Sequence, residues 1–205
     1  MARAVLLAML GRFDEAWPLA EARSTHMREV TGYTSRNTYQ YLALIATIEG
    51  DLERACRYRA EALELTQSAI AAAQAKGSLA RALCHLGRLD EAERLLKEAR
   101  TVPSPGSGVR VMATAAEALL LAHRGELAQA ESQARTAVAT AETRTDTVPW
   151  HAETHEDLAT VLDRAGRIDE AREELERARA TWERKGCLPC AERLHDRIAS
   201  LAARA

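Results

Sequence analysis

The chain has 205 residues, with 28 Lys and Arg and 30 Asp and Glu. It therefore lacks the excess of basic residues that is typical of a nucleic-acid-binding protein. Hydrophobic residues make up 47% of the chain, which is enough for a packed core and too much for a disordered protein. No apolar run approaches the ~20 residues that cross a bilayer. Ala, Leu, Arg and Glu dominate and are strong helix formers, whereas Val, Ile and aromatic residues are sparse, so the composition favours an all-helical protein.

A short phrase recurs along the chain. "LGRFDEAWPLAEA" at residues 10–22 is repeated in "LGRLDEAERLLKEA" at 86–99 and "AGRIDEAREELERA" at 165–178. The shared pattern is Gly, any residue, a large apolar residue, two mostly polar residues and Ala. It occurs five times at intervals of 37 to 41 residues, with glycines at Gly11, Gly50, Gly87, Gly125 and Gly166 and alanines at Ala16, Ala55, Ala92, Ala130 and Ala171. Self-similarity at a near-constant period indicates a repeat architecture.

Each unit is expected to be a pair of helices. The Gly ends the first helix, because glycine tolerates the left-handed conformation that closes a helix C-terminus. Asp14, Asp90 and Asp169 stand where the second helix begins, where an acid can cap free amides and suits the helix dipole. The Ala lies where the two helices cross, and its small side chain allows close approach. One pair cannot bury its own apolar faces, so stacked pairs form a solenoid.

In chain order, the five units are expected at about residues 1–31, 32–67, 68–102, 103–148 and 149–186, followed by a capping helix at 187–205. The first unit has only ten residues before its Gly, so either the chain is a piece of a longer protein or the first helix of this unit is naturally short. Loops are expected near residues 31–36, 101–108 and 143–150, the last two because Pro103, Pro105 and Pro149 interrupt helices there. Leu194, Ile198 and Leu201 give the last helix one apolar stripe.

The repeated phrase resembles the second half of a tetratricopeptide repeat (TPR), although these units exceed that family's period of ~34 residues. The resemblance implies an all-α fold, namely a right-handed α-solenoid of about five TPR-like hairpins plus a C-terminal capping helix. The longer units are similar to the helical arrays of bacterial signalling ATPases, which include maltose-activator-like LuxR-type regulators and ATPase-linked adenylate cyclases. The last 70 or so residues are the most similar to the cyclase-type proteins. No cyclase segment accompanies them, and "SPGSGVR" at 104–110 lacks the GK[ST] ending of a P-loop.

"CLPC", from Cys187 to Cys190, is a Cys-x-x-Cys at an expected helix start. The favoured interpretation is a pair of helix-cap residues. A redox pair is the first alternative, because a helix N-terminus lowers a thiol pKa. A zinc site with His195 is the second, but a fourth ligand is missing.

"HAETHED", residues 151–157, places His151 and His155 on one helix face at a spacing that can bind zinc. The metalloprotease motif requires Glu directly after the first His, and Ala152 stands there instead. His155 also holds a repeat position that normally packs between helices. We therefore expect a packing and surface role, and the sequence predicts neither a metal nor a cofactor.

The first helices of TPR-like units line an inner groove, so the resemblance supplies candidate partner-binding residues. These are Asn37, Gln40, Leu44, Gln74, Arg81, His85, Met112, Leu119, His123, Glu153, Glu156, Thr160 and Arg164. The groove would be apolar with basic points in the middle and acidic towards the C-terminal end, which suits an extended peptide or a helix. The alternative is that these residues are only solvated. The Lys/Asn clamp of chaperone-binding members is absent.

The sequence therefore predicts a non-enzymatic scaffold or sensor module of a bacterial signalling protein, with a protein or peptide partner and neither nucleic acid nor membrane. The alternative is a regulatory domain that binds a small effector. A third hypothesis, an enzyme that uses Cys187 and Cys190, predicts a thiolate below pH 7. The short first unit suggests a homodimer through that end. With no convincing cleavage site after "MARAVLLAML" and no disulfide framework among its four cysteines, we expect a cytoplasmic protein.

Overall fold

The computed structural model describes residues 1–103, 110–143 and 148–204. Within these residues the chain is helical and contains no strand, as the sequence predicts. The helices are α1 (Ala2–Met9), α2 (Phe13–Thr31), α3 (Arg36–Glu49), α4 (Leu52–Glu64), α5 (Ala69–His85), α6 (Leu89–Arg100), α7 (Val111–His123), α8 (Leu127–Glu142), α9 (Val148–Arg164), α10 (Ile168–Lys185) and α11 (Leu188–Ala202). The glycine-containing part of the expected loop at 101–108 and the centre of the loop at 143–150 lie outside the described residues.

The repeated glycines turn the first helix of each pair into the second. All five have a positive φ, between 73° and 93°, as the sequence predicts. After α5, for example, Gly87 N donates to Cys84 O at 3.1 Å and Arg88 N donates to Leu83 O at 2.9 Å, so the last carbonyls of the helix are satisfied. The repeated alanines are all fully buried, as a small side chain at a helix crossing requires.

The helix starts differ in one detail from the sequence prediction. Asp14, Asp90 and Asp169 do lie in the first turn of α2, α6 and α10, but no side chain caps these three helices. Each N-cap position is an arginine whose guanidinium pairs with a glutamate three residues on: Arg12–Glu15, Arg88–Glu91 and Arg167–Glu170. In these three repeats the acid that pairs with the N-cap arginine is therefore the Glu that follows the Asp. The capping role expected of Asp is seen instead at Asp51, which accepts from Arg54 N at 2.9 Å.

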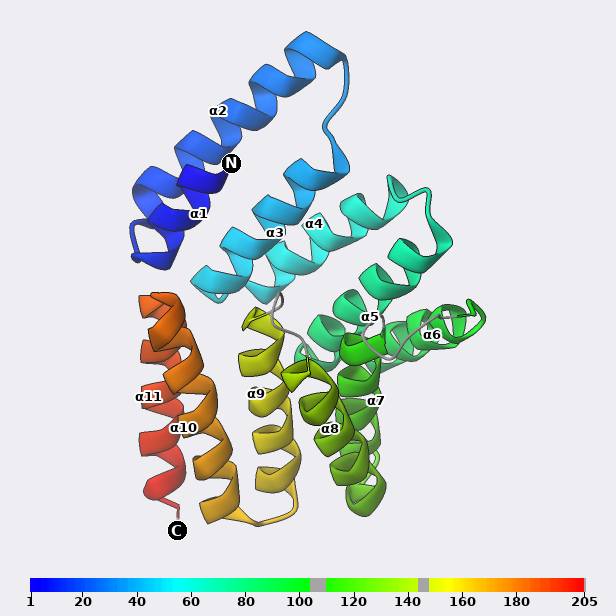
Figure 1. Ribbon diagram of the computed structural model, residues 1–205, viewed down its shortest axis with the longest axis vertical. Helices are drawn as coiled ribbons and strands as arrows, with labels where there is room; N and C mark the ends of the chain where they lie inside the picture. The colour runs from blue at the N-terminus through cyan, green and yellow to red at the C-terminus, as the bar shows by residue number, and fades with distance from the viewer. Residues whose placement is uncertain (104–109, 144–147, 205) are drawn as a thin grey trace.

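The hairpins form a row that curls until its two ends meet. Figure 1 shows α10 and α11, in orange and red, below α1 and α2, in blue. The terminal helix α11 packs on α10 and also contacts α1 and α3. Arg193 of α11 donates to the backbone oxygen of Ile48 at 2.6 Å. As a result one hydrophobic cluster includes Ala4 and Ala8 of the first helix together with Leu194 and Ile198 of the last.

The helices α5 and α7 approach each other closely in the interior. A Cβ built on Gly77 would stand 2.7 Å from the backbone nitrogen of Ala113, so only glycine fits there without displacement. By contrast, α3 and α5, both described in full, do not pack against each other. The space between them is where the candidate site lies. Among the described residues, no helix has the length and apolar character that a membrane crossing requires.

Candidate binding cavity

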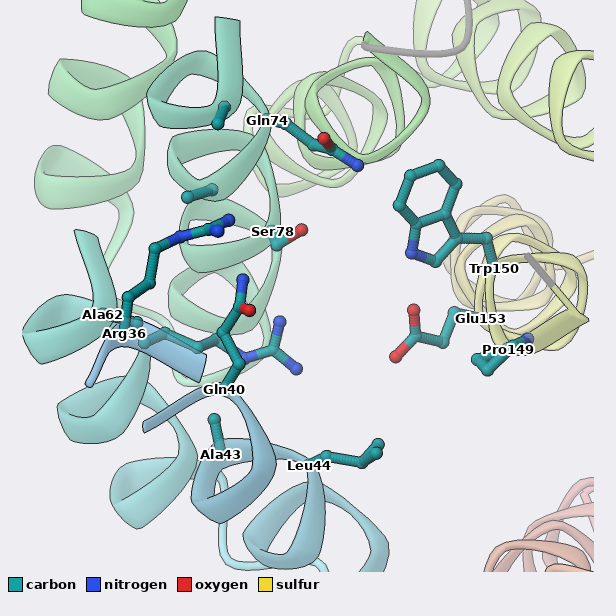
Figure 2. Close-up of a pocket in the computed structure, with 13 residues that line it drawn as sticks. Arg36, Gln40, Ala43, Leu44, Ala62, Gln74, Ser78, Pro149, Trp150 and Glu153 are labelled. Carbon is teal, nitrogen blue, oxygen red and sulfur yellow. The ribbon is translucent and has the colours of Figure 1, made fainter. Parts of the chain in front are cut away.

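A cavity of about 340 Å³ lies between α3, α4, α5 and the beginning of α9, and we call it the α3–α5–α9 cavity. In Figure 2, Arg36, Gln40 and Leu44 of α3 and Gln74 and Ser78 of α5 face Trp150 and Glu153 of α9 across an open space. The complete lining is Arg36, Gln40, Ala43, Leu44, Arg59, Ala62, Ala71, Gln74, Ala75, Ser78, Pro149, Trp150 and Glu153.

Helical spacing explains how each wall presents these side chains. Ser35 caps the start of α3, since its Oγ accepts from Thr38 N at 3.2 Å. Its residues 36, 40 and 44 are four apart and therefore share one face. On α5, residues 71, 74, 75 and 78 follow the i, i+3, i+4, i+7 spacing of one helix face. The facing wall is the first two turns of α9, where Pro149, Trp150 and Glu153 lie.

Two arginines that line the cavity each have a buried hydrogen-bond donor without an acceptor among the described residues. In the described structure, the Nε atoms of Arg36 and Arg59 are buried and have no hydrogen-bond acceptor. Arg59 crosses from α4 to donate to Thr47 Oγ1 at 3.1 Å. Burial lowers the pKa of Arg59, and the attraction of Glu153 only partly offsets this effect. A buried cation without full compensation is costly, so an anionic group placed here would gain more than it would at an exposed site.

A buried ion-pair cluster supports the facing wall. Arg81 Nε of α5 donates to Asp157 Oδ2 of α9 at 2.6 Å, and Arg81 Nη2 donates to the backbone oxygen of Glu153 at 3.2 Å. His85 Nε2 lies 2.8 Å from the other oxygen of Asp157. Burial alone would raise the pKa of Asp157, but Arg81 and His85 outweigh it and lower that pKa. Since Ser78 and Glu153 are one turn from this cluster, the cluster fixes the width of the cavity.

Four of the thirteen groove residues predicted from the sequence line this cavity: Gln40, Leu44, Gln74 and Glu153. Asn37 is exposed beside it. Met112 and Leu119 are only 2% and 1% exposed and belong to the hydrophobic core, because both sides of α7 are covered by neighbouring helices.

The other predicted groove residues are engaged within the protein. Arg81 and His85 belong to the ion-pair cluster, and Arg164 Nη2 lies 3.3 Å from the His123 ring nitrogens. Glu156 accepts from the Trp182 indole at 2.8 Å, and Thr160 accepts from Arg197 of α11 at 2.8 Å. The curl of the chain therefore fills the C-terminal half of the expected groove.

The sequence did not indicate three important cavity residues. Arg59 lies on the second helix of its hairpin, which the family pattern places outside the groove. Arg36 and Trp150 are the last residues of the two loops expected at 31–36 and 143–150, where helix starts are hard to place. A tryptophan at the beginning of a helix in a chain with three tryptophans was the one available signal.

His155 takes the packing position that the sequence predicts. Its ring is buried, and its Nδ1 lies 2.6 Å from Glu174 Oε2 of α10. Among the described residues, no group of three His, Cys, Asp or Glu side chains is arranged to hold a metal.

A second cavity, of about 410 Å³, lies between α5, α6 and α7. Its lining includes Pro103 and Arg110, which border residues outside the description. We place the candidate site in the α3–α5–α9 cavity, because the Nε donors of its two arginines lack acceptors in the described structure.

Comparisons with known proteins identify the repeats. The sequence matches tetratricopeptide-repeat families over residues 72–102, 111–136 and 152–177. The comparison with curated proteins gives no match.

Solved structures share the fold. A thermophilic TPR protein of Thermus thermophilus is similar with a TM-score of 0.60 and 22% identity over 98% of this chain and 96% of that chain. A Rap protein complexed with competence and sporulation factor has a TM-score of 0.63 and 16% identity over 97% of this chain and 62% of that one. PilW, a type IV pilus biogenesis factor, has a TM-score of 0.53 and 15% identity over 97% of this chain and 92% of that chain. The chain is thus an all-α, TPR-like solenoid that carries tetratricopeptide repeats in its third, fourth and fifth hairpins.

Proposed function

We propose that the protein is a non-catalytic interaction module that binds an extended peptide segment of a partner protein in the α3–α5–α9 cavity. The observation that carries the proposal is that Arg36 and Arg59 both line this cavity and that their buried Nε donors lack acceptors in the described structure. TPR repeats and the similarity in fold to a Rap protein complexed with competence and sporulation factor support an interaction role.

The lining indicates the chemistry of the peptide. A guanidinium binds a carboxylate through two parallel hydrogen bonds, so Arg36 and Arg59 suit an Asp or Glu side chain. Gln40 and Gln74 offer amide donors and acceptors to the backbone of an extended chain. Leu44 and the Trp150 ring supply apolar surface for a neighbouring side chain. The preferred segment therefore joins an acidic residue to an aliphatic or aromatic one.

Selection from a random peptide library displayed on phage tests this proposal. The expected peptides are enriched in Asp or Glu next to a large apolar residue. Arg36→Gln and Arg59→Gln should each weaken binding of a selected peptide about 10- to 100-fold, since a hydrogen bond to a charged group contributes about 1.5–3 kcal/mol. Arg28→Gln, on the exposed end of α2, is the matched control and should leave the affinity unchanged. Peptides whose affinity ignores both cavity changes would refute the proposal.

A small effector is the second candidate function, because about 340 Å³ falls in the size range of small-molecule sites. The resemblance to maltose-activator-like regulators supports it, and the same arginines would select an organic anion. Thermal-shift measurements with sugars, nucleotides and dicarboxylic acids distinguish the two candidates. A small anion that stabilises the wild type but not Arg59→Gln would favour the effector.

The resemblance to maltose-activator-like regulators also leads us to place this module in a bacterial signalling protein.

We further propose that the first hairpin mediates self-association. At this end of the row, Leu6 of α1 is 59% exposed, and Leu10, in the turn after α1, is 53% exposed. Light scattering at high concentration should show a dimer that Leu6→Glu dissociates. Leu65→Glu changes an exposed leucine elsewhere and should not dissociate it. A monomer at all concentrations would contradict the proposal.

A further inference from the structure

The Cys-x-x-Cys motif brings two sulfur atoms together at the junction between α10 and α11. Cys187 is the N-cap residue of α11, and Cys190 lies in its first turn. Their Sγ atoms are 2.6 Å apart, and the side chains are 1% and 3% exposed. The other two cysteines are buried in separate places, with Cys84 Sγ directed at the backbone oxygen of Ala116. A disulfide bond is about 2.05 Å long, so this pair needs only a small movement to form one.

We infer that Cys187 and Cys190 form a redox site at which a peroxide converts the two thiols into an intramolecular disulfide. This role is independent of peptide binding, because neither cysteine lines the α3–α5–α9 cavity. It goes beyond the helix-capping role that the motif first suggests.

The surroundings assign different roles to the two sulfurs. Cys187 stands at a helix N-terminus, whose positive end favours a thiolate. The hydrogen bond between the two thiols lowers the pKa of Cys187 against the opposing effect of burial, and Arg193 also lowers it. The same hydrogen bond and burial raise the pKa of Cys190. Cys187 is therefore the sulfur that reacts first, and Cys190 is the one that completes the disulfide.

The reaction balances with hydrogen peroxide as the oxidant. The Cys187 thiolate attacks one peroxide oxygen, the O–O bond breaks, and the departing hydroxide takes up a proton to become water. Cys187 is then a sulfenic acid. The sulfur of Cys190 attacks it, the S–O bond breaks, and the second hydroxide leaves as water with the Cys190 proton. Two thiols and one peroxide thus give one disulfide and two waters, and peroxide accepts two electrons.

The location of the pair gives the disulfide a structural consequence. Leu188, the first residue of α11, is 56% exposed, so the two buried cysteines are separated in the chain by a residue at the protein surface. Arg193 approaches Cys190 Sγ at 3.8 Å and also donates to Ile48 O at 2.6 Å, which joins α11 to α3. The site therefore stands at the contact that closes the curl of the chain.

Peptide mapping tests the inference on the intact protein. Folded protein is treated with hydrogen peroxide, unfolded, alkylated and digested with trypsin. Cleavage after Lys185 and Arg193 places both sulfurs in one eight-residue peptide, 186–193. We expect this peptide to lose two hydrogens when it is oxidised. Its thiols should become resistant to alkylation at a rate at least ~10-fold higher than those of Cys56 and Cys84, since reactivity follows thiolate character. Equal rates at all four cysteines, or a disulfide that forms only after unfolding in guanidinium, would overturn it.

Two variants separate a reactive pair from a packing pair. In Cys190→Ser, Cys187 should stop at the sulfenic acid and be trapped by dimedone, whereas in Cys187→Ser no fast reaction should remain. Cys84→Ser serves as the control and should leave the peptide 186–193 chemistry unchanged. Circular dichroism verifies that each variant is folded. Dimedone labelling of Cys84 rather than Cys187 in the wild-type protein would also contradict the assignment.

Discussion

Arg81 Nε lies 2.6 Å from Asp157 Oδ2, although the two residues are 76 positions apart in the chain. Both side chains are buried, and the pair joins α5 to α9 beside the proposed peptide cavity. The pair thus links the third hairpin directly to the fifth and sets the distance between the cavity walls.

Replacing Arg81 with Met should destabilise the fold by about 3–5 kcal/mol, because Asp157 is left as a buried charge without its main partner. The double change Arg81→Met with Asp157→Leu should recover much of this loss, because it also removes the charge that Arg81 had neutralised. Denaturant unfolding followed by circular dichroism measures both. Arg124→Met, which breaks an exposed pair with Glu93, is the control and should cost at most about 1 kcal/mol. Equal losses for the two single variants would contradict the structural role of Arg81.

Local sequence signals predicted the hairpins. A glycine at each turn and a small residue at each helix crossing depend on residues only a few positions away. The positive φ at Gly87 and the full burial of Ala92 therefore follow directly from the repeated phrase.

The curl of the row depends on contacts between distant residues, and no local pattern encodes them. The family pattern identified Gln40 and Gln74 because it gives the inward face of each first helix. It assumed an open groove, so it also selected Arg81, which is buried against Asp157. It missed Arg59, whose long side chain reaches the cavity from a second helix.

Gly77→Ala should destabilise the protein by about 1–3 kcal/mol. Helix propensity alone predicts the opposite, a gain of about 1 kcal/mol. The close approach to the Ala113 backbone decides the sign, since the added Cβ would meet its nitrogen at 2.7 Å. Urea titration of the variant beside the wild type gives the answer. A variant more stable than the wild type would mean that α7 can move away from α5 at little cost.

Ala92→Leu should cost about 1–3 kcal/mol, because a fully buried crossing site has no room for a larger side chain. Ala139→Leu makes the same change at an exposed position of α8, where the two residues have similar helix propensity. Comparing the thermal midpoints of the two variants isolates the packing effect. A similar midpoint for both would show that the repeated alanine is not required for helix crossing.

Glu156→Gln should stabilise the protein, and the gain should depend on pH. Burial raises the pKa of Glu156 above its ordinary value of 4.5, although Arg81 and the Trp182 indole oppose the shift. As pH rises from 4.5, the unfolded chain loses this proton before the folded one does, so the free energy of unfolding falls until the folded carboxyl has also ionised. Glutamine keeps an oxygen to accept from Trp182 but carries no proton to lose.

The advantage of Glu156→Gln over the wild type should therefore grow from pH 4.5 upward and then level off. Asp157 does not confuse this test: its lowered pKa contributes stability that is lost only as pH falls below its ordinary value of 3.8, and it does so in both proteins. Denaturant titrations from about pH 4 to about pH 8 measure the difference, and Glu173→Gln on the exposed side of α10 controls for the loss of one charge. A difference that stays constant over this range would show that Glu156 is as well solvated in the folded protein as in the unfolded chain.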